Sequence, residues 1–289
     1  MSAVEEHLAT RRAAGLFDFS FMGLYEFQGK AALQALQTRD LDALAPGQIA
    51  YTLLLKEDGA VAIDATVWRR DDDRFWLFTG KRARYDARDR SGEHAVLALQ
   101  GPASGRILAG LIGADAVRAL RYFHFMARDK MIVARLGYSG ELGYELLVPA
   151  ARAAALRQAL LERAVPECSF AAADSLRIES GYVLFDREID GQANPEELGL
   201  ERLVVPSRKF TVKKRLAGLE IQEEPLNKDL PQAVLTSECL SPTLEKRIGL
   251  GFVPPEARGE ARLADGRGAR IVPLPFYDPG RRRPRGAPI

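Results

Sequence analysis

Several residue types that mark common kinds of site are scarce in this 289-residue chain. Its two cysteines, Cys168 and Cys239, form no CxxC motif, so neither a disulfide framework nor a cysteine zinc site is indicated. Only three histidines occur, and none are spaced as HxH or HxxxH, which argues against a histidine metal site. We therefore expect no metal ion, and this cysteine usage is typical of the reducing cytoplasm.

The chain also lacks an excess of charge of either sign, and it has no long apolar run. The chain has 41 basic and 39 acidic residues, so a net charge of +2 gives no electrostatic reason to expect nucleic acid as a partner. No apolar run approaches the roughly 18 residues of a membrane helix, and residues 1–12 lack the apolar core of a signal peptide. We expect a cytoplasmic protein that binds neither nucleic acid nor membrane. The nucleotide motifs GxGxxG and GxxxxGK[ST] and the nucleophile motif GxSxG are absent.

The strongest local pattern is that of antiparallel strands. Residues 48–79 are rich in Val, Ile, Thr, Trp and Phe, and the turns "KEDG" and "RDDDR" interrupt them. Helices are predicted over 3–15, 30–37 and 151–164, from about 103, and over a segment with Asp174 as N-cap that ends at Gly181. From about 205, short strands and Pro/Gly turns indicate a small all-β domain, and the tail "GRRRPRGAPI" is predicted to be disordered. Repeated βαβ units are missing, so the fold class is α+β.

The stretch "GYSGELGYELLVPA", residues 137–150, combines three glycines with Tyr138 and Tyr144 directly before an apolar run. One interpretation is a plain turn. The other is an aromatic wall for a flat ligand, where glycines such as Gly140 let the backbone come close.

Two acidic motifs also leave two interpretations open. In "ADSLRIES", Arg177 and Glu179 belong either to a surface ion-pair ladder or to a site where Glu179 accepts parallel N–H bonds from an amidine-like edge. In "GKRARYDARDR", Asp86 lies either in a solvated loop or at the rim of a cleft, as a general acid. Five basic residues between Lys81 and Arg90 favour the ionised form of the acids among them.

Eight short motifs occur in the order and at about the spacing of one known family: "FDFSFMG", "ALQGP", "GYSGELGYEL", "ADSLRIESG", "FDREID", "NPEELGL", "SPTLEKRIGLGFVPPE" and "PLPFYDP". Each alone is weak, but together they cover about Glu5 to Arg285. The chain resembles the glycine-cleavage T-protein (aminomethyltransferase) family, which includes folate-dependent demethylases. It resembles a compact member, shortened at the N-terminus.

The resemblance implies an α+β, three-domain clover-leaf around a central cavity for tetrahydrofolate, with a C-terminal barrel- or jelly-roll-like β domain. The implied domains are 1–90 with about 172–207, about 91–171, and about 208–289. Asp86 falls on the family's catalytic aspartate, and Glu179 falls on the glutamate that holds the pterin. The resemblance also assigns folate contacts to Tyr51, Asp64, Tyr138, Gly140, Tyr144 and Arg177.

The sequence departs from the family pattern on the side of the cavity where the one-carbon donor would bind. Phe21 replaces a histidine, Lys56 replaces an asparagine, and the segments after Asp86 and after Leu216 are shortened. We therefore expect a tetrahydrofolate-dependent transferase that takes a methyl or aminomethyl group from N, O or S of a small molecule. The alternatives are a non-catalytic folate-binding scaffold or regulator, and a glycine-cleavage aminomethyltransferase whose partner is a lipoyl carrier protein.

Overall fold

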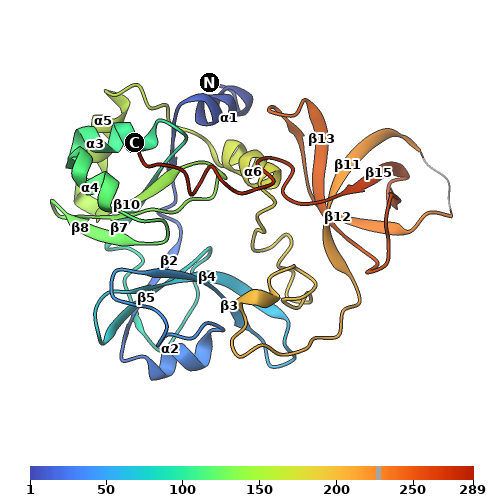
Figure 1. The fold of residues 1–289 in the computed structure, drawn as a ribbon, viewed down its shortest axis with the longest axis horizontal. Helices are drawn as coiled ribbons and strands as arrows, with labels where there is room; N and C mark the ends of the chain where they lie inside the picture. Colours follow the sequence, from blue (N-terminus) through green and yellow to red (C-terminus); the bar gives the residue numbers. More distant parts are fainter. Residues whose placement is uncertain (226–228) are drawn as a thin grey trace.

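The computed structural model describes residues 1–225 and 229–289. Its strands form two five-stranded sheets and a closed barrel. The three groups of strands lie around helix α6 (Phe170–Glu179) and the irregular segment that follows it (Figure 1). Helix and strand content of this kind confirms the α+β class, while the clover-leaf arrangement stays a prediction.

The first sheet has the strand order β1-β7-β10-β9-β8. Its strands are β1 (Gly15–Asp18), β7 (His94–Gln100), β8 (Phe125–Arg128), β9 (Met131–Ala134) and β10 (Gly143–Pro149). Helices α3 (Ser104–Ile112), α4 (Ala114–Ala119) and α5 (Ala153–Leu161) pack on one face, and η1 (Ala150–Arg152) leads into α5. The predicted alanine-rich helix is therefore confirmed in α5.

The second sheet has the order β3-β4-β5-β2-β6. Strands β3 (Ile49–Leu55), β4 (Val61–Arg69) and β5 (Arg74–Thr79) are the hairpins predicted from the sequence, while β2 (Gly23–Gln28) and the short β6 (Arg88–Asp89) complete the sheet. Helix α2 (Ala31–Leu36) covers the outer face. The inner face meets the first sheet in a second apolar core that contains Trp68, Trp76 and Phe78.

The C-terminal β domain is a closed five-stranded barrel. Its strands are β11 (Arg215–Pro225), β12 (Gln232–Ser241), β13 (Lys246–Val253), β14 (Glu260–Leu263) and β15 (Arg267–Val272), and a short helix η2 (Glu201–Leu203) precedes them. Small and branched apolar residues fill the barrel, including Leu219, Ala233 and Leu263. The prediction of an all-β C-terminal domain is confirmed.

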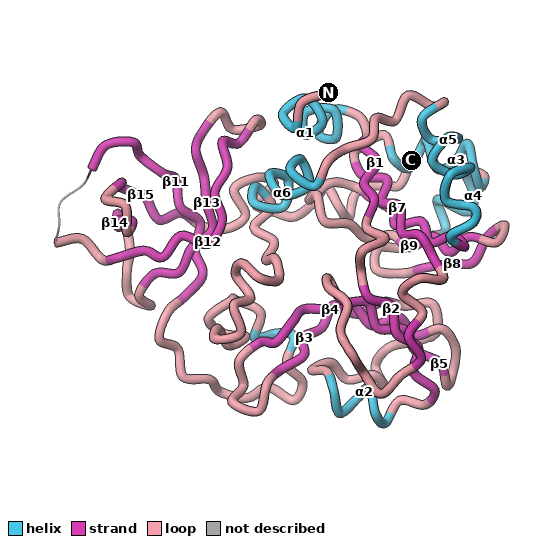
Figure 2. The backbone as a smooth tube through the Cα atoms, turned by 180° about the vertical axis from the view of Figure 1, so that it is seen from behind, coloured by secondary structure: helices cyan, strands magenta, loops and turns pink. Residues whose placement is uncertain are grey.

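Helix α6 connects the three groups. It packs against α1 (Ala3–Arg12) and against β12 and β13 of the barrel, and Figure 2 shows α1 and α6 side by side. The predicted N-cap of α6 is wrong: Ser169 caps the helix by accepting from the Ala172 N–H, and Asp174 lies inside it. The helix begins five residues earlier than predicted, and Asp174 lies inside it on the same face as Arg177, one turn away.

Two further predictions differ from the structure. Strand β1 pairs with β7, so residues 15–18 belong to the sheet of the second proposed domain rather than the first. The arginine-rich tail is ordered, because it crosses α6 towards α3 (Figure 1) and Arg135 donates to the Gly286 carbonyl. Beyond this strand, the domain boundaries stay a prediction.

Candidate functional site

Glu179, at the end of α6, is completely enclosed by its own chain. Its Oε2 accepts from Arg11 Nε and Nη2 at 3.0 and 2.7 Å, and its Oε1 lies 3.1 Å from His7 Nε2. Ser241 and the Thr243 N–H donate to the same Oε1. Burial alone raises the pKa of this carboxyl, but His7, Arg11 and Ser241 outweigh it and lower the pKa to about 2. The carboxylate predicted to hold a pterin therefore joins α1, α6 and the barrel.

Arg177 is likewise buried in a network of protein groups. It donates to Asp174 Oδ1 and Glu188 Oε2, each at 2.7 Å, and to Ser237 Oγ at 2.6 Å. Three of its donors therefore have protein acceptors. We expect this guanidinium to position the segment after α6 rather than to touch a ligand.

The glycine-rich segment 137–143 packs tightly on the protein itself. Gly140 has φ +77°, and a Cβ there would meet Ser180 Oγ at 2.1 Å, while a Cβ on Gly137 or Gly143 would strike the Gln100 side chain. The glycines thus allow close approach to protein side chains. Glycine at these positions is required by packing, whatever binds nearby.

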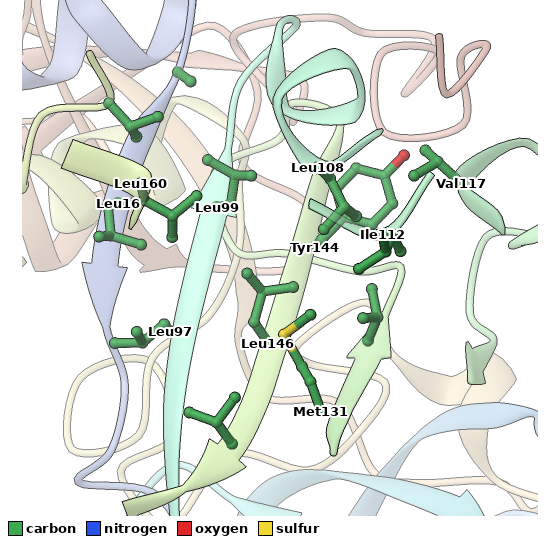
Figure 3. Packing of buried hydrophobic residues seen from close by; sticks show 14 of the residues in the cluster. Leu16, Leu97, Leu99, Leu108, Ile112, Val117, Met131, Tyr144, Leu146 and Leu160 are labelled. Atoms are coloured by element: carbon green, nitrogen blue, oxygen red, sulfur yellow. The ribbon is translucent and has the colours of Figure 1, made fainter. Parts of the chain in front are cut away.

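Tyr144 lies in the core between β10 and helices α3 and α4 (Figure 3). The next residue, Glu145, faces the opposite side of β10, where Ala98 and Ala134 flank it. Its carboxyl is buried and receives no hydrogen bond from the described residues, and burial raises its pKa to about 7. Sequence analysis did not single out this acid, because its isolation depends on tertiary packing.

Three of the predicted residues do come together. Tyr51 of β3 donates from Oη to Asp64 Oδ2 of β4 at 2.8 Å. Tyr138 lies in the loop between β9 and β10. Burial raises the pKa of its phenol most, and the charge of Asp64 raises it further. Tyr138 in turn donates to the Val183 carbonyl at 2.6 Å and stacks on Tyr182 with ring centroids 5.9 Å apart. Tyr182 was missed by sequence analysis, since nothing in its spacing indicates this stack.

Burial makes Asp64 unusual among the carboxyl groups of the chain. It raises the pKa to about 6, although the hydrogen bond from Tyr51 works in the opposite direction. Asp64 remains partly exposed, and so do Tyr51 and Tyr138. A flat, N–H-rich ring fits this group, because it can stack on tyrosine and donate to a carboxyl that forms no ion pair with the described residues.

Asp86, the predicted catalytic residue, is exposed in the connection between β5 and β6. It forms no hydrogen bond or ion pair within the described residues, whereas its neighbour Tyr85 packs on Tyr25. The structure thus groups Tyr51, Asp64 and Tyr138, and leaves Asp86 outside that group.

Neither a metal nor a membrane site is evident in the part of the chain that the structure describes. No group of three or more His, Cys, Asp or Glu residues is placed to hold a metal ion. None of the described helices has both the length and the apolar character to cross a membrane.

Comparisons with known proteins agree with the resemblance drawn from the motifs. A family model described as the GCVT N-terminal domain matches residues 1–208. Aminomethyltransferases of Rubrobacter xylanophilus and Symbiobacterium thermophilum are 33% and 34% identical to this chain. The alignments cover 97% and 98% of this chain, and 88% and 91% of the relatives.

The chain belongs to the glycine-cleavage T-protein family. The crystal structure of glycine cleavage system aminomethyltransferase T from Bartonella henselae superimposes with a TM-score of 0.79 at 26% identity, covering 96% of this chain and 90% of that chain. Membership in this family of aminomethyltransferases makes the chain an enzyme of the transferase class, and tetrahydrofolate is the family's acceptor.

Proposed function

We propose that this protein transfers an aminomethyl group from a lipoyl carrier protein to tetrahydrofolate. The observation that carries the proposal is the near-complete match to aminomethyltransferases, since both the relatives and this chain are covered almost end to end. This alternative is better supported than our sequence-based expectation of a small-molecule methyl donor. Glycine-cleavage chemistry is therefore the first activity to test.

The acceptor would bind at the Tyr51, Asp64 and Tyr138 group. Aromatic faces at Tyr138 and Tyr182 suit a flat ring, and Asp64 offers an acceptor without a competing cation. Glu179 and Arg177 are expected to support the wall from behind, because their polar groups are already satisfied within the protein. The resemblance assigns the handling of protons to Asp86, and this assignment stays a hypothesis.

The overall reaction needs no covalent bond to the protein, but protons must be transferred between the acceptor and the leaving groups. A carbon–sulfur bond breaks, the carbon joins two nitrogens of the acceptor, and ammonia leaves. The two acceptor N–H protons end on the thiol and on the ammonia, so atoms and charge balance. Holding donor and acceptor in line and supplying one acid–base group are the main demands on the protein.

A small-molecule donor remains the second candidate. The observation in its favour is the short connection between β5 and β7, which holds only the two-residue strand β6 and leaves Asp86 exposed. A carrier protein would have fewer elements to contact there. A folate-binding protein without catalysis is the third candidate.

The deciding experiment supplies purified protein with tetrahydrofolate and an aminomethylated lipoyl carrier. We expect ammonia and methylene-tetrahydrofolate in equal amounts, and tetrahydrofolate alone should raise the melting temperature by mass action. Product from sarcosine- or glycine-betaine-like donors but none from the carrier would favour the second candidate. Folate binding without turnover on any donor would favour the third.

A further inference from the structure

We propose that residues 278–289, which we call the strap, position Tyr182 in the wall of the acceptor site. Tyr182 stacks on Tyr138, and these two rings are the aromatic faces that the proposed function offers to the acceptor. The inference rests on the proposed function and deepens it, because it names what holds that wall in place. Its basis is a series of contacts that runs from Tyr182 to helix α3.

The strap meets the wall at Arg281. The guanidinium carbon of Arg281 lies 5.4 Å from the centroid of the Tyr182 ring, within the range of a cation–π contact. Burial raises the pKa of the Tyr182 phenol, and the positive charge of Arg281 opposes this increase. Tyr182 is therefore in contact with Tyr138 and with Arg281, two residues that are far apart in sequence.

A tight turn with an unusual backbone conformation precedes this contact. Asp278 and Arg281 have φ values of +50° and +49°, in the left-handed region that residues other than glycine rarely adopt. The Arg281 N–H donates to the Asp278 carbonyl at 2.7 Å, and the Arg283 N–H donates to Asp278 Oδ2 at 2.8 Å. Such a conformation persists only where surrounding contacts impose it. The turn thus fixes the place from which Arg281 reaches Tyr182.

The middle of the strap is held by aromatic rings as well. Arg283 lies 4.9 Å from the centroid of Tyr277 and donates to Glu141 Oε2 at 3.4 Å. Arg285 lies 6.0 Å from the centroid of Tyr122. Both arginines therefore keep the strap against the protein surface where it crosses α6 (Figure 1).

The far end of the strap lies against Arg135 and helix α3. Arg135 donates to the Gly286 carbonyl. A Cβ on Gly105 of α3 would overlap the Pro288 carbonyl, so the end of the strap fits only because residue 105 has no side chain. The strap is thus fixed at both ends, at Tyr182 and at Gly105.

This attachment bears on how tightly an acceptor ring binds. A strap that is released from Gly105 would no longer hold Arg281 against Tyr182, and the Tyr182 ring would gain conformations that ligand binding must remove. Ordering one mobile side chain on binding weakens affinity by about 2-fold to 12-fold. Release of the strap should therefore weaken the binding of tetrahydrofolate and leave the chemical step unchanged at saturation.

Gly105→Ala tests this by releasing the strap without removing any of it. Gly110→Ala is the matched control in the same helix, because a Cβ there would meet Arg163 Nε at an ordinary 3.6 Å. Alanine favours the helix at both positions. By isothermal titration calorimetry, the dissociation constant of tetrahydrofolate should rise about 5-fold to 10-fold in Gly105→Ala and stay within about 2-fold of wild type in Gly110→Ala.

Release of the strap has a readout of its own that needs no ligand. Trypsin cleaves after arginine, and the strap contains four arginines. Cleavage within a bound segment depends on how often that segment opens. Mass spectrometry should show that Gly105→Ala loses the strap faster than wild type and Gly110→Ala do. Equal rates in all three proteins would show that Gly105 does not hold the strap and would overturn the inference.

Arg281→Ala tests the contact with Tyr182 directly. It should raise the dissociation constant of tetrahydrofolate about 3-fold to 10-fold, and Arg281→Lys should restore part of the loss because it keeps the cation over the ring. The control is Arg282→Ala, at an exposed neighbour. With the lipoyl carrier as donor, Arg281→Ala should raise KM for tetrahydrofolate and leave kcat within about 2-fold, whereas a loss of folded protein would lower kcat alone.

The outcomes distinguish the inference from the function on which it rests. Faster loss of the strap with an unchanged or lower dissociation constant in Gly105→Ala would overturn the inference alone, as would an unchanged dissociation constant in Arg281→Ala. Folate binding by wild type without turnover of the carrier would refute the proposed function, while the dissociation constants would still decide the inference. Absence of tetrahydrofolate binding by wild type would refute both.

Discussion

Glu179 and Asp64 are two inward-facing carboxyl groups with opposite surroundings. Glu179 receives hydrogen bonds or ion pairs from Arg11, His7 and Ser241, and its pKa falls to about 2. Among the described residues Asp64 accepts one side-chain hydrogen bond, from the Tyr51 phenol, and burial raises its pKa to about 6. Burial acts to raise the pKa of both carboxyl groups, so burial alone does not determine the direction of the shift.

The comparison separates a group that holds the fold from one that is available for chemistry. A fully paired carboxylate is committed to its partners, and its charge stabilises the native state at neutral pH. An unpaired one costs stability when ionised and retains affinity for a proton or for a donor on a ligand. We therefore infer that Glu179 holds the fold together, whereas Asp64 stays available to a proton or to a donor on a ligand.

The largest expected effect is that of Glu179→Ala on stability. The change leaves Arg11 buried without its main acceptor and should lower the free energy of unfolding by about 3–5 kcal/mol, the range for breaking a buried ion pair. Urea denaturation at pH 7 measures this, with the exposed Glu196→Ala as control. A stable Glu179→Ala variant that has lost only folate binding would restore the pterin-binding assignment.

The next effect depends on pH and concerns Glu145. Its pKa is raised to about 7 by burial, so ionisation destabilises the native state as pH rises from about 4.5 through 7. Glu145→Gln removes that cost and should raise the free energy of unfolding by about 2–3 kcal/mol above pH 7 and by little at pH 4.5. Paired urea titrations at pH 4.5 and 8 check this. An equal change at both pH values would mean that the effect is steric.

A smaller effect is expected from Tyr144→Phe. The Tyr144 hydroxyl is buried without a hydrogen-bond partner among the described residues, and the ring fills the core of the first sheet. Removing an unsatisfied hydroxyl while keeping the ring should leave stability unchanged or raise it by about 1 kcal/mol. Tetrahydrofolate affinity should not change. A ten-fold weaker affinity would show that Tyr144 contacts the ligand as the resemblance implies.

Short-range sequence patterns predicted several helices and strands correctly. The hairpins of β3, β4 and β5, helix α5 and the all-β C-terminal domain follow from strand alternation, turn residues and helix propensity. The N-cap of α6 failed because both Ser169 and Asp174 are good caps, and only packing of the whole helix decides between them.

Motif matching brought several candidate site residues to notice, but whether they bind a ligand stays a prediction. Motif order brought Tyr51, Asp64 and Tyr138 to notice, and the structure places them together. The roles of Glu179 and Arg177 depend on partners such as Arg11 and Ser237, which are far away in sequence. The tail was predicted to be disordered because composition cannot reveal its contact with Arg135.

The smallest expected effect is that of Asp86→Asn on stability, and it completes the comparison between carboxyl groups. Asp86 is exposed and has no partner within the described residues, so a change from carboxylate to amide removes no contact. The free energy of unfolding should stay within about 0.5 kcal/mol of wild type from pH 4 to 8, as for most surface substitutions. Denaturation curves at three pH values measure this, with Asp64→Asn as the matched variant that should respond. Because stability is untouched, any loss of turnover in Asp86→Asn reports chemistry or carrier contact directly. A destabilisation above 1 kcal/mol would show instead that the Asp86 side chain has partners in the folded protein in solution.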